Sequence, residues 1–346
     1  MPDFYPYGEK NYLFTIGDRS IMVGACRMRD TPSVACGDSS PRGGAEALRA
    51  IVPFLVWGHG SFWNGGKRKM LLRFIVMLAL VLAAAVGLPC GIFEGYTWLW
   101  AYPLLALGFA VLGLGACFGY LMILCKRVDQ EKEQEEDDPH YRRYTELILD
   151  SVLPVLRIDV KTKGLNKIPS QGRFVLVCNH CNNSDPIILL RAFEGHQVAF
   201  ISKKENKDMF VVGPMMHKLL CQLIDRENDR EALKTIIRCI KLLKEDKASI
   251  GVFPEGYIHE DLKLHRFRPG VFKIAQKAQV PIVVCTLKNT KDVIRNMARY
   301  RRSSVELSLL EVIPAEELAG VTTTEIADRV YRLMADDLGP ENVAEE

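Results

Sequence analysis

The chain has 346 residues, of which 48% are hydrophobic and 25% are charged. This length exceeds the ~250 to 300 residues at which one core stops growing, and the composition excludes wholesale disorder, so we expect several parts, most of them folded. Forty-five Lys and Arg against 42 Asp and Glu leave a net charge of only +3. This balance excludes the dense basic surface that a nucleic-acid-binding protein needs.

Residues 1–66 are rich in Gly, Ser, Pro and Asp and show no sustained helical or strand period. They are predicted to form a poorly structured leader. The ten cysteines are spread along the chain, several of them inside apolar runs. This distribution predicts buried thiols in a reducing compartment and not a disulfide framework.

Residues 67–127 are predicted to form a hydrophobic two-helix membrane hairpin. Residues 74–93 carry no charge and would span about 30 Å as a helix, and residues 95–125 form a second uncharged run after Glu94. Gly115 and Gly119 would let the two helices approach closely. Basic residues on both flanks place both ends, and the rest of the chain, on the cytoplasmic face. The alternatives are a buried helix pair in a soluble core, or a signal peptide followed by an anchor.

Residues 128–144 form a charged linker, in which the run up to Asp138 is predicted to be solvated or an exposed helix. In residues 145–338, apolar runs of strand length alternate with helical patterns. This alternation predicts an α/β domain with a largely parallel sheet flanked by helices, followed by a tail at 339–346.

Four predicted strands each run into a polar cluster. Since ligands bind outside the carboxyl ends of the strands in such sheets, these clusters are expected to lie together at that end of the sheet. The strands at 174–178, 198–201, 223–224 and 250–253 lead into Asn179-His180, Ser202-Lys203-Lys204, Asp225-Arg226 and Pro254-Glu255-Gly256.

His180 and Asp185 are the candidate catalytic pair. A neutral imidazole can take a proton from a hydroxyl, and a carboxylate can fix its tautomer. Asp185 precedes Pro186 and an apolar helix, so it is also expected to cap that helix, which by itself would explain the residue. A zinc site with Cys178, Cys181 and His196 is a further alternative, but no second Cys/His pair with finger-like spacing follows.

The order of these clusters resembles that of the 1-acylglycerol-3-phosphate (lysophosphatidate) acyltransferases, the PlsC type of glycerolipid acyltransferase. The stretches that carry the resemblance are NHCNNSD at 179–185, LIDREN at 223–228, FPEG at 253–256 and VPIVV at 280–284, with lesser matches at 203–205 and 267–275. The resemblance covers roughly residues 145–300, in family order. It implies that residues 145–338 are an acyltransferase domain.

The resemblance also implies a reaction. An acyl chain passes from acyl-CoA or acyl-carrier protein to the sn-2 hydroxyl of 1-acylglycerol-3-phosphate, with His180 and Asp185 as the base and no metal or cofactor. Its expected partners are the bilayer, the lysophospholipid and the acyl donor. Backbone N–H groups near His180 or Gly256 are the candidates for holding the oxyanion. The implied acceptor-binding residues are Arg226, Phe253, Pro254, Glu255 and Gly256, with Lys203 as a lesser candidate.

Simpler explanations exist for these residues: an ordinary turn at 254–256, a surface ion pair at Arg226, and solvated lysines at 203–204. The chain also departs from the family after FPEG, where Tyr257-Ile258-His259 replace a Thr-Arg-Ser type sequence. A different lysophospholipid or an aminoacyl lipid is therefore an alternative acceptor. More distant alternatives are a hydrolase with Ser184 as nucleophile, although no Gly-x-Ser-x-Gly elbow is present, and a non-catalytic membrane-anchored scaffold.

Overall fold

The computed structural model describes residues 15–16, 19–20, 70–90, 92, 96–225 and 228–344. The chain divides into two compact units, Met1–Trp63 and Asn64–Glu346. In the first unit, β1 (Thr15–Ile16) pairs antiparallel with β2 (Arg19–Ser20). The rest of the leader predicted for residues 1–66 lies outside the described residues.

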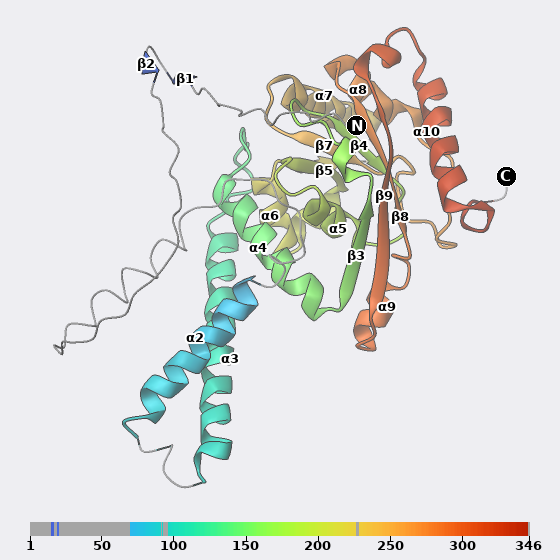
Figure 1. The fold of residues 1–346 in the computed structure, drawn as a ribbon. Coiled ribbons are helices and arrows are strands. Elements are labelled where there is room, and N and C mark those ends of the chain that lie inside the picture. The colour runs from blue at the N-terminus through green and yellow to red at the C-terminus, as the bar shows by residue number, and fades with distance from the viewer. Residues whose placement is uncertain are drawn as a thin grey trace, which may run out of the picture. The chain divides into compact units, whose positions relative to one another are not determined.

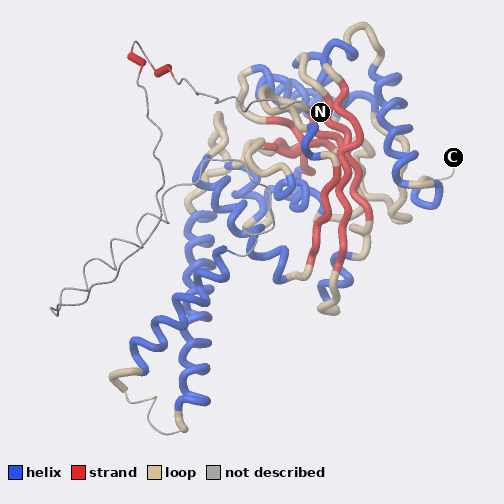
Figure 2. Tube along the Cα trace, in the orientation of Figure 1, coloured by secondary structure: helices blue, strands red, loops and turns tan. Residues whose placement is uncertain are grey.

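A seven-stranded sheet forms the centre of the second unit (Figures 1 and 2). Its order is β3-β9-β8-β4-β7-β5-β6, and among the described strands of this sheet only the β8–β9 pair is antiparallel. The predicted, largely parallel α/β fold is confirmed. The strands are β3 (Ile158–Lys163), β4 (Val175–Cys178), β5 (Val198–Lys203), β6 (Gln222–Ile224), β7 (Ser249–Val252), β8 (Ile282–Lys288) and β9 (Ser303–Ile313).

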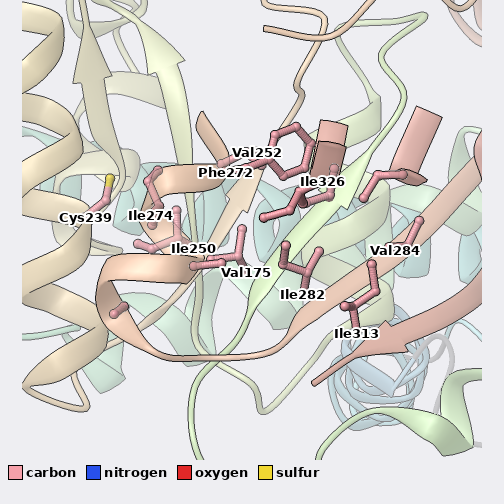
Figure 3. Packing of buried hydrophobic residues seen from close by; sticks show 14 of the residues in the cluster. Val175, Cys239, Ile250, Val252, Phe272, Ile274, Ile282, Val284, Ile313 and Ile326 are labelled. Carbon is pink, nitrogen blue, oxygen red and sulfur yellow. The ribbon is translucent and has the colours of Figure 1, made fainter. Parts of the chain in front are cut away.

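Successive side chains of a strand point to opposite faces of the sheet. Because both faces of this sheet carry apolar side chains, helices cover both of them. On β4, Val175 and Val177 face a core with α7, α8 and α10, part of which Figure 3 shows. Leu176 and Cys178 face the opposite core with α4, α5 and α9. These helices and α6 are α4 (Pro139–Val155), α5 (Asp185–Ala192), α6 (Val212–Lys218), α7 (Asp229–Lys244), α8 (Lys273–Ala278), α9 (Val293–Ala298) and α10 (Thr323–Leu338).

Two apolar helices, α2 (Met70–Gly87) and α3 (Trp98–Lys126), precede the sheet and contact each other. Among the described helices, α3 alone is long and apolar enough to cross a membrane by length and composition, whereas α2 is a shorter apolar helix. A hairpin of two spanning helices is therefore not confirmed. Glu94, its predicted tip, lies outside the described residues.

The contact between α2 and α3 uses a different glycine from the pair that the sequence suggested. Ile75, Ala79 and Ala83 recur every fourth residue and are buried, so they form the inner face of α2. A Cβ built on Gly113 would lie 3.0 Å from Cγ2 of Ile75, whereas one built on Gly115 or Gly119 would meet nothing within 4 Å. The prediction that Gly115 and Gly119 form the close contact is wrong.

The carboxyl end of α3 and the charged linker are both attached to the sheet domain. Leu124 and Cys125 pack with residues of α4 and α6, and the hydroxyl of Tyr141 donates to the Leu124 carbonyl at 3.0 Å. The run that ends at Asp138 is not a helix, so of its two predicted forms the exposed helix is not found and the linker remains. Its acidic side chains pair with lysines of the domain, among them Glu131 with Lys207 at 2.5 Å and Glu136 with Lys247 at 2.6 Å.

We predict that Gly113→Leu lowers the thermal stability of the detergent-solubilised chain. The added side chain must displace Ile75, and overpacking of this kind costs about 1 to 3 kcal/mol. Gly115→Leu is the matched control, because the space around its Cβ is open. Equal unfolding temperatures for the two variants would contradict this packing.

Candidate active site

The carboxyl ends of β4 and β7 bring two of the predicted clusters together. The strands are parallel neighbours, with Val177 opposite Val252. Each strand then runs into its polar segment, so the loop that carries His180 lies beside the loop that carries Glu255. The backbone N–H of His180 donates to Oε1 of Glu255 at 2.8 Å, which joins the two loops directly.

His180 and Asp185 form the pair that their spacing suggested. Nδ1 of His180 lies 3.1 Å from Oδ2 of Asp185. The imidazole is 15% exposed and the carboxylate is fully buried. With its proton on Nδ1, the ring carries its lone pair on Nε2, and no described residue hydrogen-bonds to Nε2. This arrangement can accept a proton from a ligand hydroxyl.

Asp185 holds the loop around His180 and does not cap α5. Its Oδ2 also accepts the N–H groups of Cys181 and Asn182, both at 2.8 Å. Ser184 stands at the N-cap position, without a side-chain capping bond, and Asp185 is already helical. The capping prediction is therefore wrong, because this carboxylate turns back to the amides that precede the helix.

Glu255 is a buried brace between two loops. Only 2% of it is exposed. Its second oxygen, Oε2, accepts the N–H of His265 at 3.1 Å. Burial raises the pKa of this carboxyl to about 7, while the backbone bonds from His180 and His265 oppose the rise.

Cys181 sits next to the candidate base but is not an activated thiol. Burial, followed by the negative charges of Asp185 and Glu255, raises its pKa to about 12. A thiolate nucleophile is therefore disfavoured at this position. Ser184, the nucleophile of the hydrolase alternative, donates its hydroxyl to Oδ1 of Asn182 at 3.0 Å.

Aromatic stacking supports the imidazole from the side of β7. The ring of Phe253 stacks on His180 with centroids 4.1 Å apart, and Phe200 of β5 stacks on Phe253 at 5.7 Å. Gly251 of β7 makes this possible, because a Cβ there would lie 2.4 Å from the Phe200 ring. The row of rings fixes the plane of the imidazole.

Asn179 is a positioning residue that precedes His180 in the NHCNNSD stretch and had no predicted role. Its side chain is buried and bridges to β8: Nδ2 donates to the Leu287 carbonyl at 3.0 Å, and Oδ1 accepts the Leu287 N–H at 2.8 Å. These two bonds tie the end of β4 to the end of β8 immediately before His180. An amide beside a candidate base is the signal that could have identified it.

A hollow of about 510 Å³ opens next to Glu255. His259 and His265 stack there with centroids 3.5 Å apart, and the Arg268 guanidinium lies 5.9 Å from the centre of the Tyr257 ring. Burial, followed by the charge of His265, lowers the pKa of His259. In the described part of the chain, Arg268 forms no ion pair. Tyr257 and His259 depart from the family pattern in the sequence, whereas His265 and Arg268 were not predicted as site residues. The hollow is lined by Glu255, Tyr257, His259, His265, Arg266, Arg268, Tyr331 and Ala344.

Three further residues were predicted to bind the acceptor: Lys203, Arg226 and Pro254. Lys203 is exposed at the end of β5, two strand positions from β4 and thus about 10 Å away along the sheet. Arg226 lies outside the described residues. Pro254 is buried.

Gly256 has a φ of 90° and its N–H donates to the Phe253 carbonyl, so this candidate oxyanion donor is occupied. The N–H groups of His180, Cys181, Asn182 and Ser184 are also occupied. Asn183 keeps a free N–H in this loop as far as the described residues go, so it is the remaining candidate near His180 for contacting an oxyanion.

The zinc alternative finds no geometric support. The imidazole of His196 packs edge-on against Phe174 and Phe193, while Cys178 is buried in the core of the sheet. No three His, Cys, Asp or Glu side chains in the described ranges are grouped so that they could hold a metal ion. The eight cysteines in those ranges are free thiols.

Residues 159–288 match the protein-family model described as Acyltransferase. This match confirms the resemblance for that segment, which carries an acyltransferase-family domain. It includes His180, Asp185 and Glu255, the three residues that the geometry places together.

Curated relatives have names that agree with the family. The 1-acyl-sn-glycerol-3-phosphate acyltransferase of Saccharomyces cerevisiae is 29% identical over 53% of this chain and 61% of the relative. A probable 1-acyl-sn-glycerol-3-phosphate acyltransferase of Mycoplasma pneumoniae is 32% identical over 38% of this chain and 50% of the relative. The matched region thus spans less than two thirds of these relatives. In the crystal structure of the 1-acyl-sn-glycerophosphate acyltransferase PlsC from Thermotoga maritima, 95% of the chain aligns with 77% of this one at 18% identity and a TM-score of 0.49.

We predict that Glu255→Gln changes how stability depends on pH. Folding holds the Glu255 proton up to about pH 7, whereas a glutamate with the ordinary pKa of 4.5 releases it earlier. The folded chain therefore binds more protons between these values, and this group makes the free energy of unfolding fall as pH rises from about 4.5 to about 7. Urea unfolding at several pH values should show that this component is missing in the variant. Parallel curves would contradict the raised pKa.

Proposed function

We propose that this chain transfers an acyl chain from an acyl thioester to the sn-2 hydroxyl of 1-acylglycerol-3-phosphate, which yields phosphatidate. The observation that carries the proposal is the His180–Asp185 pair, 3.1 Å apart, at the carboxyl end of β4 within the acyltransferase-family segment. The names of the curated relatives support the same reaction. The thioester donor is acyl-CoA or acyl-carrier protein.

The proposed reaction needs one base and no covalent enzyme intermediate. Nε2 of His180 takes the proton of the acceptor hydroxyl, and the hydroxyl oxygen attacks the thioester carbonyl. The carbon–sulfur bond then breaks, and the imidazolium returns its proton to the leaving thiolate. Asp185 stabilises the imidazolium and keeps the proton on Nδ1 between these steps.

The surroundings of His180 suit this role. Because Cys181 has a raised pKa and the Ser184 hydroxyl is directed at Asn182, neither competes with the acceptor hydroxyl as the nucleophile. Phe253 packs against the imidazole and reduces its access to water. A partly enclosed base favours transfer over hydrolysis of the thioester.

The proposed location is a membrane, with the catalytic domain on its cytoplasmic face. The length and apolar composition of α3 support membrane association. Basic residues flank the apolar helices on both sides, which supports the orientation. A cytoplasmic site would meet both a soluble donor and an acceptor that is held in the leaflet.

A different acceptor within the same reaction class is the second candidate. The hollow beside Glu255 offers Arg268, two histidines and two tyrosines, which could hold an anionic or aromatic-stacking head group larger than a phosphate. Tyr257 and His259, which depart from the family pattern, both line it. Another lysophospholipid or an aminoacyl lipid would suit this space.

We predict that His180→Ala lowers kcat by about 10² to 10⁴, the usual contribution of a positioned acid–base group, while the protein stays folded. Asp185→Asn should also lose activity, because an amide cannot stabilise the imidazolium. Acyl transfer and thermal unfolding are measured together. Ser184→Ala is the matched control and should stay near the wild-type rate. A folded His180→Ala enzyme of nearly full activity would refute the base.

A second prediction separates the two candidate acceptors. If Arg226 binds the acceptor phosphate, Arg226→Lys raises the apparent KM of lysophosphatidate more than that of the donor, since a point charge replaces a bidentate fork. Arg268→Gln should leave both KM values unchanged. The opposite pattern, with the acceptor KM rising only in Arg268→Gln, would assign the head group to the hollow and favour the larger acceptor.

A further inference from the structure

Residues 291–302 form an exposed basic segment at the end of the sheet that carries the active site. The segment contains α9 and the turn after it, and its sequence holds five basic residues against one acidic residue. The segment follows β8, which ends at Lys288. Because β8 runs parallel to β4, the segment emerges at the same end of the sheet as His180. Figure 1 draws α9 at this end of β8, near the start of β3.

Strand pairing fixes the segment at that end of the sheet. β9 runs antiparallel to β8 and begins at Ser303, and Ser303 is opposite Ile158 at the start of β3. The N–H of Ser303 donates to the Arg157 carbonyl at 3.0 Å. Arg157 in turn donates from Nη1 to the Tyr300 carbonyl at 3.1 Å. The basic segment is therefore attached on both sides to strands that start or finish at the same end of the sheet as His180.

Large apolar side chains alternate with the charges on this segment. Ile294 is 47% exposed, Met297 39% and Tyr300 70%. They recur every third residue, while Val293 faces the core. Lys291, Arg299 and Arg301 have no acidic partner within ion-pair distance among the described residues. Arg295 and Arg302 do pair, with Asp292 at 2.8 Å and Asp159 at 3.3 Å.

We propose that residues 291–302 dock on the surface of an anionic phospholipid bilayer. The guanidinium and ammonium groups would contact lipid phosphates, and Ile294, Met297 and Tyr300 would enter the boundary between head groups and acyl chains. Arg157, whose guanidinium carbon lies 5.1 Å from the centre of the Tyr300 ring, extends the same surface. An exclusively polar partner would leave the three apolar side chains without a role.

This docking would turn the end of the sheet that carries His180 toward the leaflet. The inference rests on the proposed function in one respect: an acceptor held in the bilayer has to reach His180 without leaving the lipid. The segment and His180 lie at the same end of the sheet. Asn179, next to His180, is hydrogen-bonded to Leu287, which is only four residues before Lys291. Contact between the segment and the bilayer therefore brings the base close to the lipid surface.

The test is amide hydrogen exchange of the full chain reconstituted in vesicles, read by mass spectrometry on peptides that cover residues 291–302. Vesicles of phosphatidylcholine alone are compared with vesicles that also contain phosphatidylglycerol. We expect slower exchange of this segment in the anionic vesicles, and loss of that protection at high salt. Arg299→Gln combined with Arg301→Gln should weaken the docking about 10- to 30-fold.

Lys273→Gln combined with Lys277→Gln is the matched control. It also removes two positive charges from exposed side chains. These lie on α8, which leads into the start of β8 at the opposite end of the sheet. This control should exchange like the wild type. Equal exchange in both kinds of vesicle, or an equal effect of the two double variants, would overturn the inference.

The readout needs no turnover, so it separates the inference from the proposed function. Normal acyl transfer with no lipid-dependent protection would refute the docking and leave the function standing. Protection without acyl transfer would refute the function and leave the docking standing. If acidic acyl-carrier protein protects the segment in the absence of vesicles, and anionic vesicles do not, the surface belongs to the donor and the inference fails.

Discussion

The buried carboxylate of Asp185 is the constraint on which the site depends. An ionised carboxylate without partners would be costly to bury, and here three N–H groups, two of them from the backbone, converge on a single oxygen. The same bonds that stabilise the charge bend the loop after β4 and orient the imidazole of His180. The fold of the loop and the tautomer of the base are thus set by one interaction.

Glu255 supplies the second half of that constraint from the neighbouring strand. It accepts the His180 N–H with one oxygen and the His265 N–H with the other, so one side chain joins the base, the end of β7 and the wall of the hollow. The family resemblance implied that Glu255 binds substrate, and that role stays a prediction. The observed bonds describe a brace, and they imply that changes in the hollow can reach His180 through a single side chain.

The sequence predicted the parts of this structure that depend on local pattern. The apolar runs identified β4, β5, β6 and β7 to within about two residues, and the spacing of His180 and Asp185 identified the pair. It missed features set by distant contacts. The bond from His180 to Glu255 joins residues 75 positions apart. The choice of Gly113 over Gly115 depends on how α2 packs on α3, which residue spacing in α3 alone does not reveal.

The most direct test of the account is product analysis with the purified full chain, a donor labelled with ¹³C in its acyl carbonyl, and 1-acylglycerol-3-phosphate. The account predicts phosphatidate with the labelled acyl group on the sn-2 oxygen and one free thiol released for each product molecule. It also predicts that no labelled acyl group is found on the protein after mixing with the donor alone. Release of labelled free fatty acid without phosphatidate, or a stable acyl-protein, would contradict direct transfer by His180.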